Sequence, residues 1–128
     1  PLCKIASGGE LSRVMLAIKS SLVDKDNIPT MIFDEIDAGI SGSAARKVGV
    51  KIKQIAQSRQ IICVTHLAQI ASLADEHFKI QKNVTGDRTF TQVDLLDESG
   101  RVEEVARIMS TGVITDAMRN SAIELMKE

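Results

Sequence analysis

Two short apolar runs, each ending abruptly at a pair of polar residues, place the strongest restriction on the fold of this chain. The first covers residues 29–33 and ends at an Asp-Glu pair, and the second covers residues 61–64 and ends at a Thr-His pair. A compact apolar run bounded by turn signals is typical of a buried, parallel strand. A helical pattern over about residues 43–58 separates the two runs, and this order favours a right-handed parallel crossover. The sequence therefore predicts an α/β layered sheet with parallel strands.

A helix is expected near the beginning of the chain. Ser7, followed three residues later by Glu10, forms the capping-box pattern of a helix N-terminus, and the polar residues 24–27 mark the end of this helix. Apolar residues recur between them at helical spacing and form one stripe, which consists of Leu11, Val14, Met15, Ile18 and Leu22. The helix at 43–58 is expected to bury Val48, Ile52 and Ile55.

The second half of the chain has a different pattern. Two strand-like stretches around a Thr-Gly-Asp turn at residues 85–87 predict a C-terminal hairpin, flanked by helices. No repeat, low-complexity segment or convincing linker interrupts the chain, so the sequence predicts one domain over residues 1–128. The elements expected here are a short helix, two strands and two closing helices, over residues 67–74, 78–82, 89–96, 102–110 and 115–126.

The composition argues against several functions. The formal net charge is −1 and no dense Lys/Arg run occurs, whereas a dedicated nucleic-acid or membrane surface needs clustered cations. Only three residues are aromatic, all of them Phe, which disfavours a base-stacking platform. No apolar run approaches membrane-spanning length, so no membrane partner is expected. Cys3 and Cys63 lack metal-ligand spacing, and Cys63 lies in an apolar run, which favours a reducing, cytoplasmic compartment.

The tetrad at residues 7–10 is the first of three short motifs that could carry chemistry. A helix N-terminus offers unpaired N–H groups and the positive end of the helix dipole, and glycines let a phosphate approach the backbone. The tetrad could therefore bind a terminal phosphate, although the same residues also make an ordinary helix start. Its members are Ser7, Gly8, Gly9 and Glu10.

The other two motifs stand at the ends of the apolar runs. Asp34, at the carboxyl end of a strand, could hold hydrated Mg²⁺, and Glu35 beside it could orient or deprotonate an attacking water. His66 at the end of the next run could contact a phosphate or that water. Each motif has an ordinary alternative, a plain strand end for the carboxylates and an incidental residue for the imidazole. His77 has no partner pattern and is interpreted as structural or on the surface.

The order and spacing of the motifs favour one common site. Twenty-seven positions separate Ser7 from Asp34, which leaves room for one helix and one strand, and thirty-one separate Glu35 from His66, which leaves room for a loop, a helix and a strand. Because parallel strands end at the same edge of a sheet, each motif falls where a single nucleotide-binding edge would place it.

These motifs resemble those of the ABC-type ATPases. The tetrad is similar to the ABC signature, Asp34-Glu35 to Walker B with its catalytic glutamate, and His66 to the switch histidine. The sequences of residues 6–13 and 33–42 resemble the SMC-like branch more than the transporter ATPases. Within that branch they are most similar to the RecN-type bacterial ATPases of DNA double-strand-break repair. The stretch at 101–109 resembles the one that follows the last strands of that family, so the resemblance covers nearly the whole chain.

The resemblance implies that two heads bind ATP between them. The tetrad of one head would close over the γ-phosphate held by the other head, and Asp37 and Gly39, in the position of the D-loop, would lie along the seam between the heads. Asp34 would bind Mg²⁺ through water, Glu35 would act as general base, and His66 would sense the γ-phosphate.

The partners that the resemblance implies are a second head in a homodimer, a P-loop lobe located earlier in the same protein, and DNA. Binding of ATP would join the heads and hydrolysis would separate them, coupled to engagement of DNA. The implied location is cytoplasmic and nucleoid-associated.

The sequence lacks two features of the family, a P-loop and a coiled coil. None of its eight glycines begins a Gly-x-x-x-x-Gly-Lys-[Ser/Thr] P-loop, and no sustained heptads occur. Because the chain also begins Pro-Leu-Cys rather than with Met, it is expected to be the C-terminal lobe of a head, excised from a longer protein and inactive alone.

Two alternatives remain at this point. One is an ABC-like interaction module without turnover, which would not need Glu35 or His66. The other is a transporter-type ATPase subunit. The loop at residues 36–42 disfavours it because that loop lacks the Ser-Ala-Leu-Asp sequence of transporters, and the predicted hairpin disfavours it as well.

Overall fold

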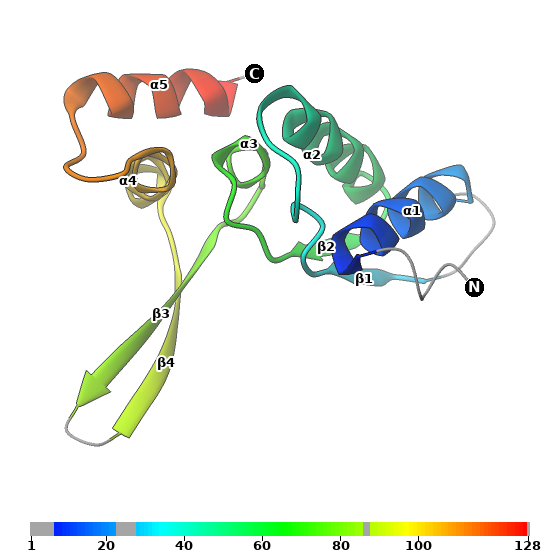
Figure 1. The fold of residues 1–128 in the computed structure, drawn as a ribbon, viewed down its shortest axis with the longest axis horizontal. Coiled ribbons are helices and arrows are strands. Elements are labelled where there is room, and N and C mark those ends of the chain that lie inside the picture. Colours follow the sequence, from blue (N-terminus) through cyan, green and yellow to red (C-terminus); the bar gives the residue numbers. More distant parts are fainter. Residues whose placement is uncertain (1–6, 23–27, 86–87, 128) are drawn as a thin grey trace. The chain divides into compact units, whose positions relative to one another are not determined.

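The computed structural model describes residues 7–22, 28–85 and 88–127, and these residues fall into two compact units (Figure 1). The first unit ends at Leu73 and the second begins at Ala74. Cys3, the polar turn at 24–27 and the Gly-Asp tip of the expected hairpin lie outside the described residues. That residues 1–128 act as one domain, the C-terminal lobe of a head, stays a prediction.

The first unit has the strand–helix–strand order that the sequence predicts. β1 and β2 pair in parallel, with Met31 beside Ile61 and Ile32 beside Ile62. The expected helix at 43–58 is confirmed, while the short helix expected over 67–74 is a single turn of four residues. The elements in chain order are α1 (Gly8–Ser21), β1 (Thr30–Phe33), α2 (Gly42–Ala56), β2 (Gln60–Cys63) and α3 (Ala68–Ala71).

The core of this unit lies on one face of the β1–β2 sheet. Met31 and Phe33 point from β1 into the core, and Figure 1 shows α1 and α2 on this same side of the strands. Cys63 of β2 packs against the core as a small, partly buried side chain, as expected of a free thiol in an apolar run. The helices contribute Leu16, Ile52, Ile55 and Ile70, with Val48 partly buried.

The opposite face of the sheet is uncovered, so the predicted burial of the strands is confirmed for one face only. Ile32 is 69% exposed, and Ile62 and Val64 are also exposed. Because successive side chains of a strand alternate between faces, Ile32 and Ile62 lie away from Met31 and Phe33. Apolar runs such as these indicate burial on both faces, but among the described residues only one face of the sheet is packed.

The apolar stripe of α1 also faces solvent. The helix begins at the predicted cap, Ser7, and ends at Ser21, and Leu16 is its one buried large side chain. The five residues of the stripe, Leu11, Val14, Met15, Ile18 and Leu22, are all exposed. The helical period therefore predicted the helix correctly, but the side of the helix that packs into the core is that of Leu16 and not that of the stripe.

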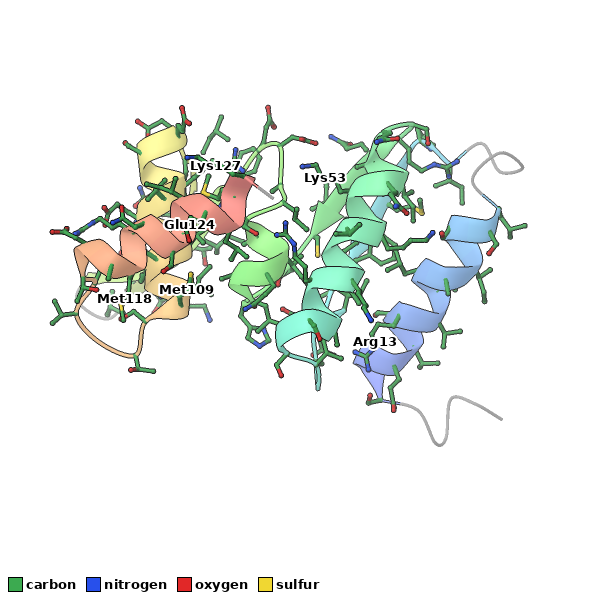
Figure 2. All side chains as sticks on the ribbon, turned by 90° about the horizontal axis from the view of Figure 1, so that it is seen from above. Arg13, Lys53, Met109, Met118, Glu124 and Lys127 are labelled. Atoms are coloured by element: carbon green, nitrogen blue, oxygen red, sulfur yellow. The ribbon has the colours of Figure 1, made fainter. Side chains whose placement is uncertain are left out.

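The second unit contains a hairpin and two helices. β3 (Phe78–Thr85) and β4 (Arg88–Leu95) pair antiparallel, as predicted. α4 (Glu98–Met109) is capped at its N-terminus by Asp97, whose carboxylate accepts a 2.7 Å hydrogen bond from the Gly100 N–H. α5 (Asp116–Lys127) packs against α4 (Figure 2), and Arg119 pairs with Glu103 at 2.6 Å across the two helices. Their buried side chains include Val105, Ala106 and Ala122.

A buried carboxylate organises the second unit. Glu104 is 7% exposed and pairs with Lys79 at 2.9 Å and with Arg107 at 2.6 Å. The Arg107 hydrogen bonds, joined by that of Lys79, outweigh the effect of burial and lower the pKa of Glu104 to about 2. His77 precedes β3, and its Nδ1 is buried without a hydrogen-bond partner among the described residues. Burial lowers the pKa of His77 despite the nearby charge of Glu104.

Among the described residues, every helix falls short of the length and apolarity needed to cross a membrane.

We predict that the second unit loses stability in acid through Glu104. Since its pKa is lowered from 4.5 to about 2, the ion pairs contribute fully above pH 4.5 and are lost as the pH falls towards 2. That difference corresponds to roughly 3 kcal/mol. Urea unfolding of the Glu104→Gln variant should depend less on pH between 5 and 2 than that of the wild type. Glu103→Gln, on an exposed carboxylate of the same helix, is the matched control and should leave the acid dependence in place.

We also predict self-association through the stripe of α1. An exposed apolar surface of this kind favours contact with another such surface. Replacing Val14 and Ile18 with Lys should lower the fraction of dimers in sedimentation equilibrium, with little effect on unfolding because both side chains are already exposed. The control is Val113→Lys, at an apolar residue that is 87% exposed and lies outside the stripe. A wild-type chain that stays monomeric at all concentrations would contradict this prediction.

Candidate functional site

The N-terminus of α1 is built as the capping-box pattern predicts. The Glu10 N–H donates to Ser7 Oγ at 3.4 Å, and Glu10 Oε2 accepts from the Ser7 N–H at 2.8 Å and from Ser7 Oγ at 2.9 Å. The backbone bond and then the hydroxyl bond lower the pKa of Glu10. The helix therefore begins at Gly8, with the positive end of its dipole at Ser7–Gly9.

Two residues of α1 fix the helix against the loop that follows β1. Ser12 Oγ donates to the Asp34 carbonyl at 3.1 Å. Arg13 Nη1 donates to the carbonyls of Ile36 and Ala38, at 3.2 and 2.7 Å, and Figure 2 shows Arg13 on the first half of α1. Sequence reasoning did not find these contacts. The only available signal was that a serine and an arginine follow the tetrad directly.

The absence of side chains on the two glycines allows this close approach. A Cβ on Gly9 would lie 2.8 Å from the Glu35 carbonyl oxygen and 2.8 Å from the Cβ of Ala38. A Cβ on Gly8 would lie 2.7 Å from Glu35 Oε2, at the free end of a side chain. The backbone of the loop thus leaves no room for a side chain at Gly9. At Gly8, only the movable end of the Glu35 side chain restricts the space.

The carboxylate pair at the end of β1 sits at a sharp change of chain direction. Glu35 has φ of 55°, the only positive value among described residues other than glycine, and such a conformation costs about 1 kcal/mol or more. The Glu35 N–H donates to Asp34 Oδ1 at 2.9 Å, and the Ala38 N–H donates to the Glu35 carbonyl at 3.0 Å. These bonds and the contact with Gly9 hold the strained residue in place.

Asp37 connects the loop after β1 with the end of β2. It is 2% exposed, and its Oδ2 accepts from Thr65 Oγ1 at 2.6 Å and from the His66 N–H at 2.9 Å. His66 Nδ1 lies 3.1 Å from the same oxygen. Burial alone would raise the pKa of Asp37, but the bonds from Thr65 and His66 outweigh it and the pKa is lowered. Thr65 was not among the residues that the sequence analysis selected.

The three predicted motifs meet at one hollow of about 420 Å³ in the first unit. Glu10 and Gly39 are not part of its lining. The Glu10 carboxylate accepts the capping hydrogen bonds from Ser7. Gly39, with φ of 74°, follows the last lining residue of this loop, Ala38. Ala38 and Val64 line it in addition to the predicted residues and Thr65. The lining consists of Ser7, Gly8, Gly9, Asp34, Glu35, Asp37, Ala38, Val64, Thr65 and His66.

The hollow carries negative charge. Three carboxylates and one imidazole line it, and no Lys or Arg is among its lining residues. Next to it, burial and then the charges of Asp37 and Asp34 raise the pKa of Cys63 to about 11. No group of three or more His, Cys, Asp or Glu side chains is placed to hold a metal ion among the described residues. Asp34, an exposed carboxylate at the end of β1, could supply a single ligand to a hydrated cation.

A comparison with solved structures identifies the fold. A solved structure from work on ATP-driven dimerization and DNA-stimulated activation of SMC ATPases matches 86% of this chain and 66% of that chain, with a TM-score of 0.59 and 22% identity. The chain thus has part of the fold of an SMC ATPase head, as the sequence predicted. No family model matches the chain.

Curated relatives identify the branch. The chain is 42% identical to DNA repair protein RecN of Bacillus subtilis over 99% of its length, 48% to that of Deinococcus radiodurans over 98%, and 50% to that of Rickettsia prowazekii over 96%. This is a RecN-type chain. It spans about 22% of the length of each of these relatives.

We predict different costs for the same substitution at two neighbouring glycines. Gly9→Ala places a methyl group against the backbone of residues 35 and 38, so it should lower the free energy of unfolding by about 1–3 kcal/mol. Gly8→Ala displaces only the end of the Glu35 side chain and also gains helix propensity, so it should change stability by less than about 1 kcal/mol. Urea unfolding of both variants tests this. Equal losses would show that α1 does not rest on the loop as described.

Proposed function

We propose that this chain is the C-terminal part of an ATP-binding and ATP-hydrolysing head of a DNA repair protein. The observation that carries the proposal is the meeting of the tetrad, the carboxylate pair and His66 at one hollow, supported by the RecN relatives and by the SMC ATPase fold. In the full-length protein, ATP-driven association of two heads would be coupled to engagement of DNA, and the location would be cytoplasmic.

The residues divide into two roles in this proposal. The N-terminus of α1 supplies N–H groups and the positive end of a dipole, which suit the terminal phosphate of an ATP held by a second head. Glu35, held beside Asp34 at the end of β1, is the general base for the attacking water, and His66 contacts the γ-phosphate. Gly39 lies at the seam between the heads.

A magnesium ion fits the donor chemistry of the site. Mg²⁺ is commonly bound by one or two carboxylates together with water and the phosphates of the substrate. Asp34 is exposed and offers one carboxylate, with Oδ1 already accepting the Glu35 N–H. The ion would neutralise charge on the phosphates, and Asp34 would hold it at the edge of the sheet, next to the general base.

The charge of the hollow explains why a second lobe is needed. Three carboxylates without a lining Lys or Arg repel a polyphosphate. A P-loop supplies backbone N–H groups and a lysine for this purpose, and the sequence contains none. The P-loop lobe of the same protein and a second head are therefore the partners proposed for this chain.

We predict that the purified chain does not hydrolyse ATP, because the phosphate-binding lysine is absent. A coupled assay for ADP release, with the Glu35→Gln variant as background, measures this. Turnover that depends on Glu35 in the isolated chain would refute the prediction.

The positive test places the chain in a complete protein. In a chimera, this chain replaces the segment to which it aligns in the Bacillus subtilis RecN, and ATP hydrolysis is compared with that of the parent. We expect the chimera to hydrolyse ATP, and Glu35→Gln to lower kcat by about 100-fold or more, the scale of a lost general base. Glu103→Gln, far along the chain from the hollow, is the matched control. An active parent with an inactive, folded chimera would contradict the proposed function and favour a module without turnover.

A further inference from the structure

The formal net charge of −1 conceals an uneven distribution of charge along the chain. Residues 1–73 contain nine Lys or Arg and six Asp or Glu, a net charge of +3, whereas residues 74–128 contain seven and eleven, a net charge of −4. The stretch between Asp37 and Asp75 carries five Lys or Arg and no acidic residue. Four of these five cations belong to α2. A large share of the positive charge of the first unit therefore lies on one helix.

The lysines of α2 lie on its solvent side. The side that packs against the core carries Ala45, Gly49, Ile52 and Ile55. Lys47, Lys51 and Lys53 are all exposed, and Figure 2 shows Lys53 on the second half of the helix. Lys47 and Lys51 are four residues apart, so they are neighbours on successive turns, about 6 Å apart along the helix axis. The helix therefore presents a basic surface to solvent.

No carboxylate of the described residues forms an ion pair with these three lysines. The helices of the second unit differ, since α5 pairs Arg119 with Asp116 within the same helix. Like charges at the spacing of Lys47 and Lys51 repel each other and weaken a helix. A polyanion bound at this surface would relieve that repulsion, which indicates the chemistry of the partner.

We propose that the outer face of α2, formed by Lys47, Lys51 and Lys53 with the exposed side chains of Ser43 and Gln54, binds the phosphate backbone of duplex DNA. Lysine supplies a positive charge to a phosphate, and Ser and Gln side chains donate hydrogen bonds to its oxygens. Contacts with phosphates carry no sequence information, so binding is independent of base sequence. The choice of DNA as the polyanion rests on the proposed function, whereas the charge of the face does not.

The outer face of α2 is less suited to an anionic membrane. A helix that lies in a membrane interface inserts an apolar side beneath its charged side. The apolar side of α2 is already packed into the core of the first unit, and Val50 is the one large apolar residue exposed on this helix. None of the three lysines lines the hollow, so the face is also separate from the candidate ATP site.

The test is fluorescence anisotropy of a labelled DNA duplex titrated with the purified chain at several salt concentrations. Because each neutralised phosphate releases counterions, the slope of log Kd against log salt reports the number of charged contacts. Replacing Lys47, Lys51 and Lys53 together with Gln, which has a similar helix propensity, should weaken binding in about 50 mM salt by about tenfold or more. It should also reduce the salt slope by roughly 3.

The matched control replaces Lys82, Arg88 and Lys127 with Gln, which removes the same charge from exposed positions of the second unit. It should change the affinity by less than about threefold and leave the salt slope nearly unchanged. An equal loss of affinity in the two triple variants would show that net charge alone governs binding, and would overturn the proposal. A wild-type chain that does not bind the duplex at about 100 µM in low salt would overturn it as well.

Two further measurements separate DNA from other partners and locate the contact. Amide shifts of the 15N-labelled chain on addition of duplex should change along α2, and changes confined to the hairpin would overturn the proposal. Sedimentation with vesicles that contain phosphatidylserine tests the membrane. Binding to vesicles that depends on the three lysines, without binding to DNA, would overturn the proposal and assign the face to a membrane surface.

Failure of this proposal can be told apart from failure of the proposed function, because DNA binding is measured on the isolated chain without ATP. In the chimera with the Bacillus subtilis RecN, the triple lysine variant should hydrolyse ATP at the rate of the unmodified chimera when DNA is absent, since its lysines lie outside the hollow. An inactive chimera would contradict the proposed function while leaving the result on DNA binding intact.

Discussion

The hydrogen bonds that hold the loop of residues 34–38 are the constraint on which the site depends. Arg13 and Ser12 hold this loop from the side of α1, and Thr65 and His66 hold Asp37 from the end of β2. Without these bonds, the tetrad, the carboxylate pair and the imidazole would sit on three separately moving elements. Because the loop is fixed from both sides, all three groups face one hollow.

The same loop shows how strain and packing support each other. Glu35 has a positive φ, which only surrounding contacts can maintain in a residue with a side chain. Gly9 supplies one of those contacts, since its lack of a side chain lets α1 lie against the Glu35 carbonyl. Gly9 therefore has a role in the fold itself, in addition to the phosphate binding proposed for the helix N-terminus.

Among the described residues, the first unit has no cation lining its acidic hollow and nothing covering part of its apolar surface. The hollow has carboxylates but no lining cation, and one face of the sheet and the stripe of α1 are apolar and exposed. Both features fit a proposal in which other parts of a longer protein supply the cations and cover the apolar surfaces. The share of the RecN relatives that this chain spans, about 22%, agrees with that proposal.

The sequence by itself determined the order of the elements, the cap at Ser7 and the position of each motif, because caps, turns and strand ends depend on neighbouring residues. The tertiary structure alone decided that Leu16, and not the stripe of α1, enters the core, and that Ile32 is uncovered. It also decided the contacts of Arg13 and Asp37. Their partners lie more than twenty positions away along the chain, and no local pattern specifies which distant carbonyl or imidazole a side chain will meet.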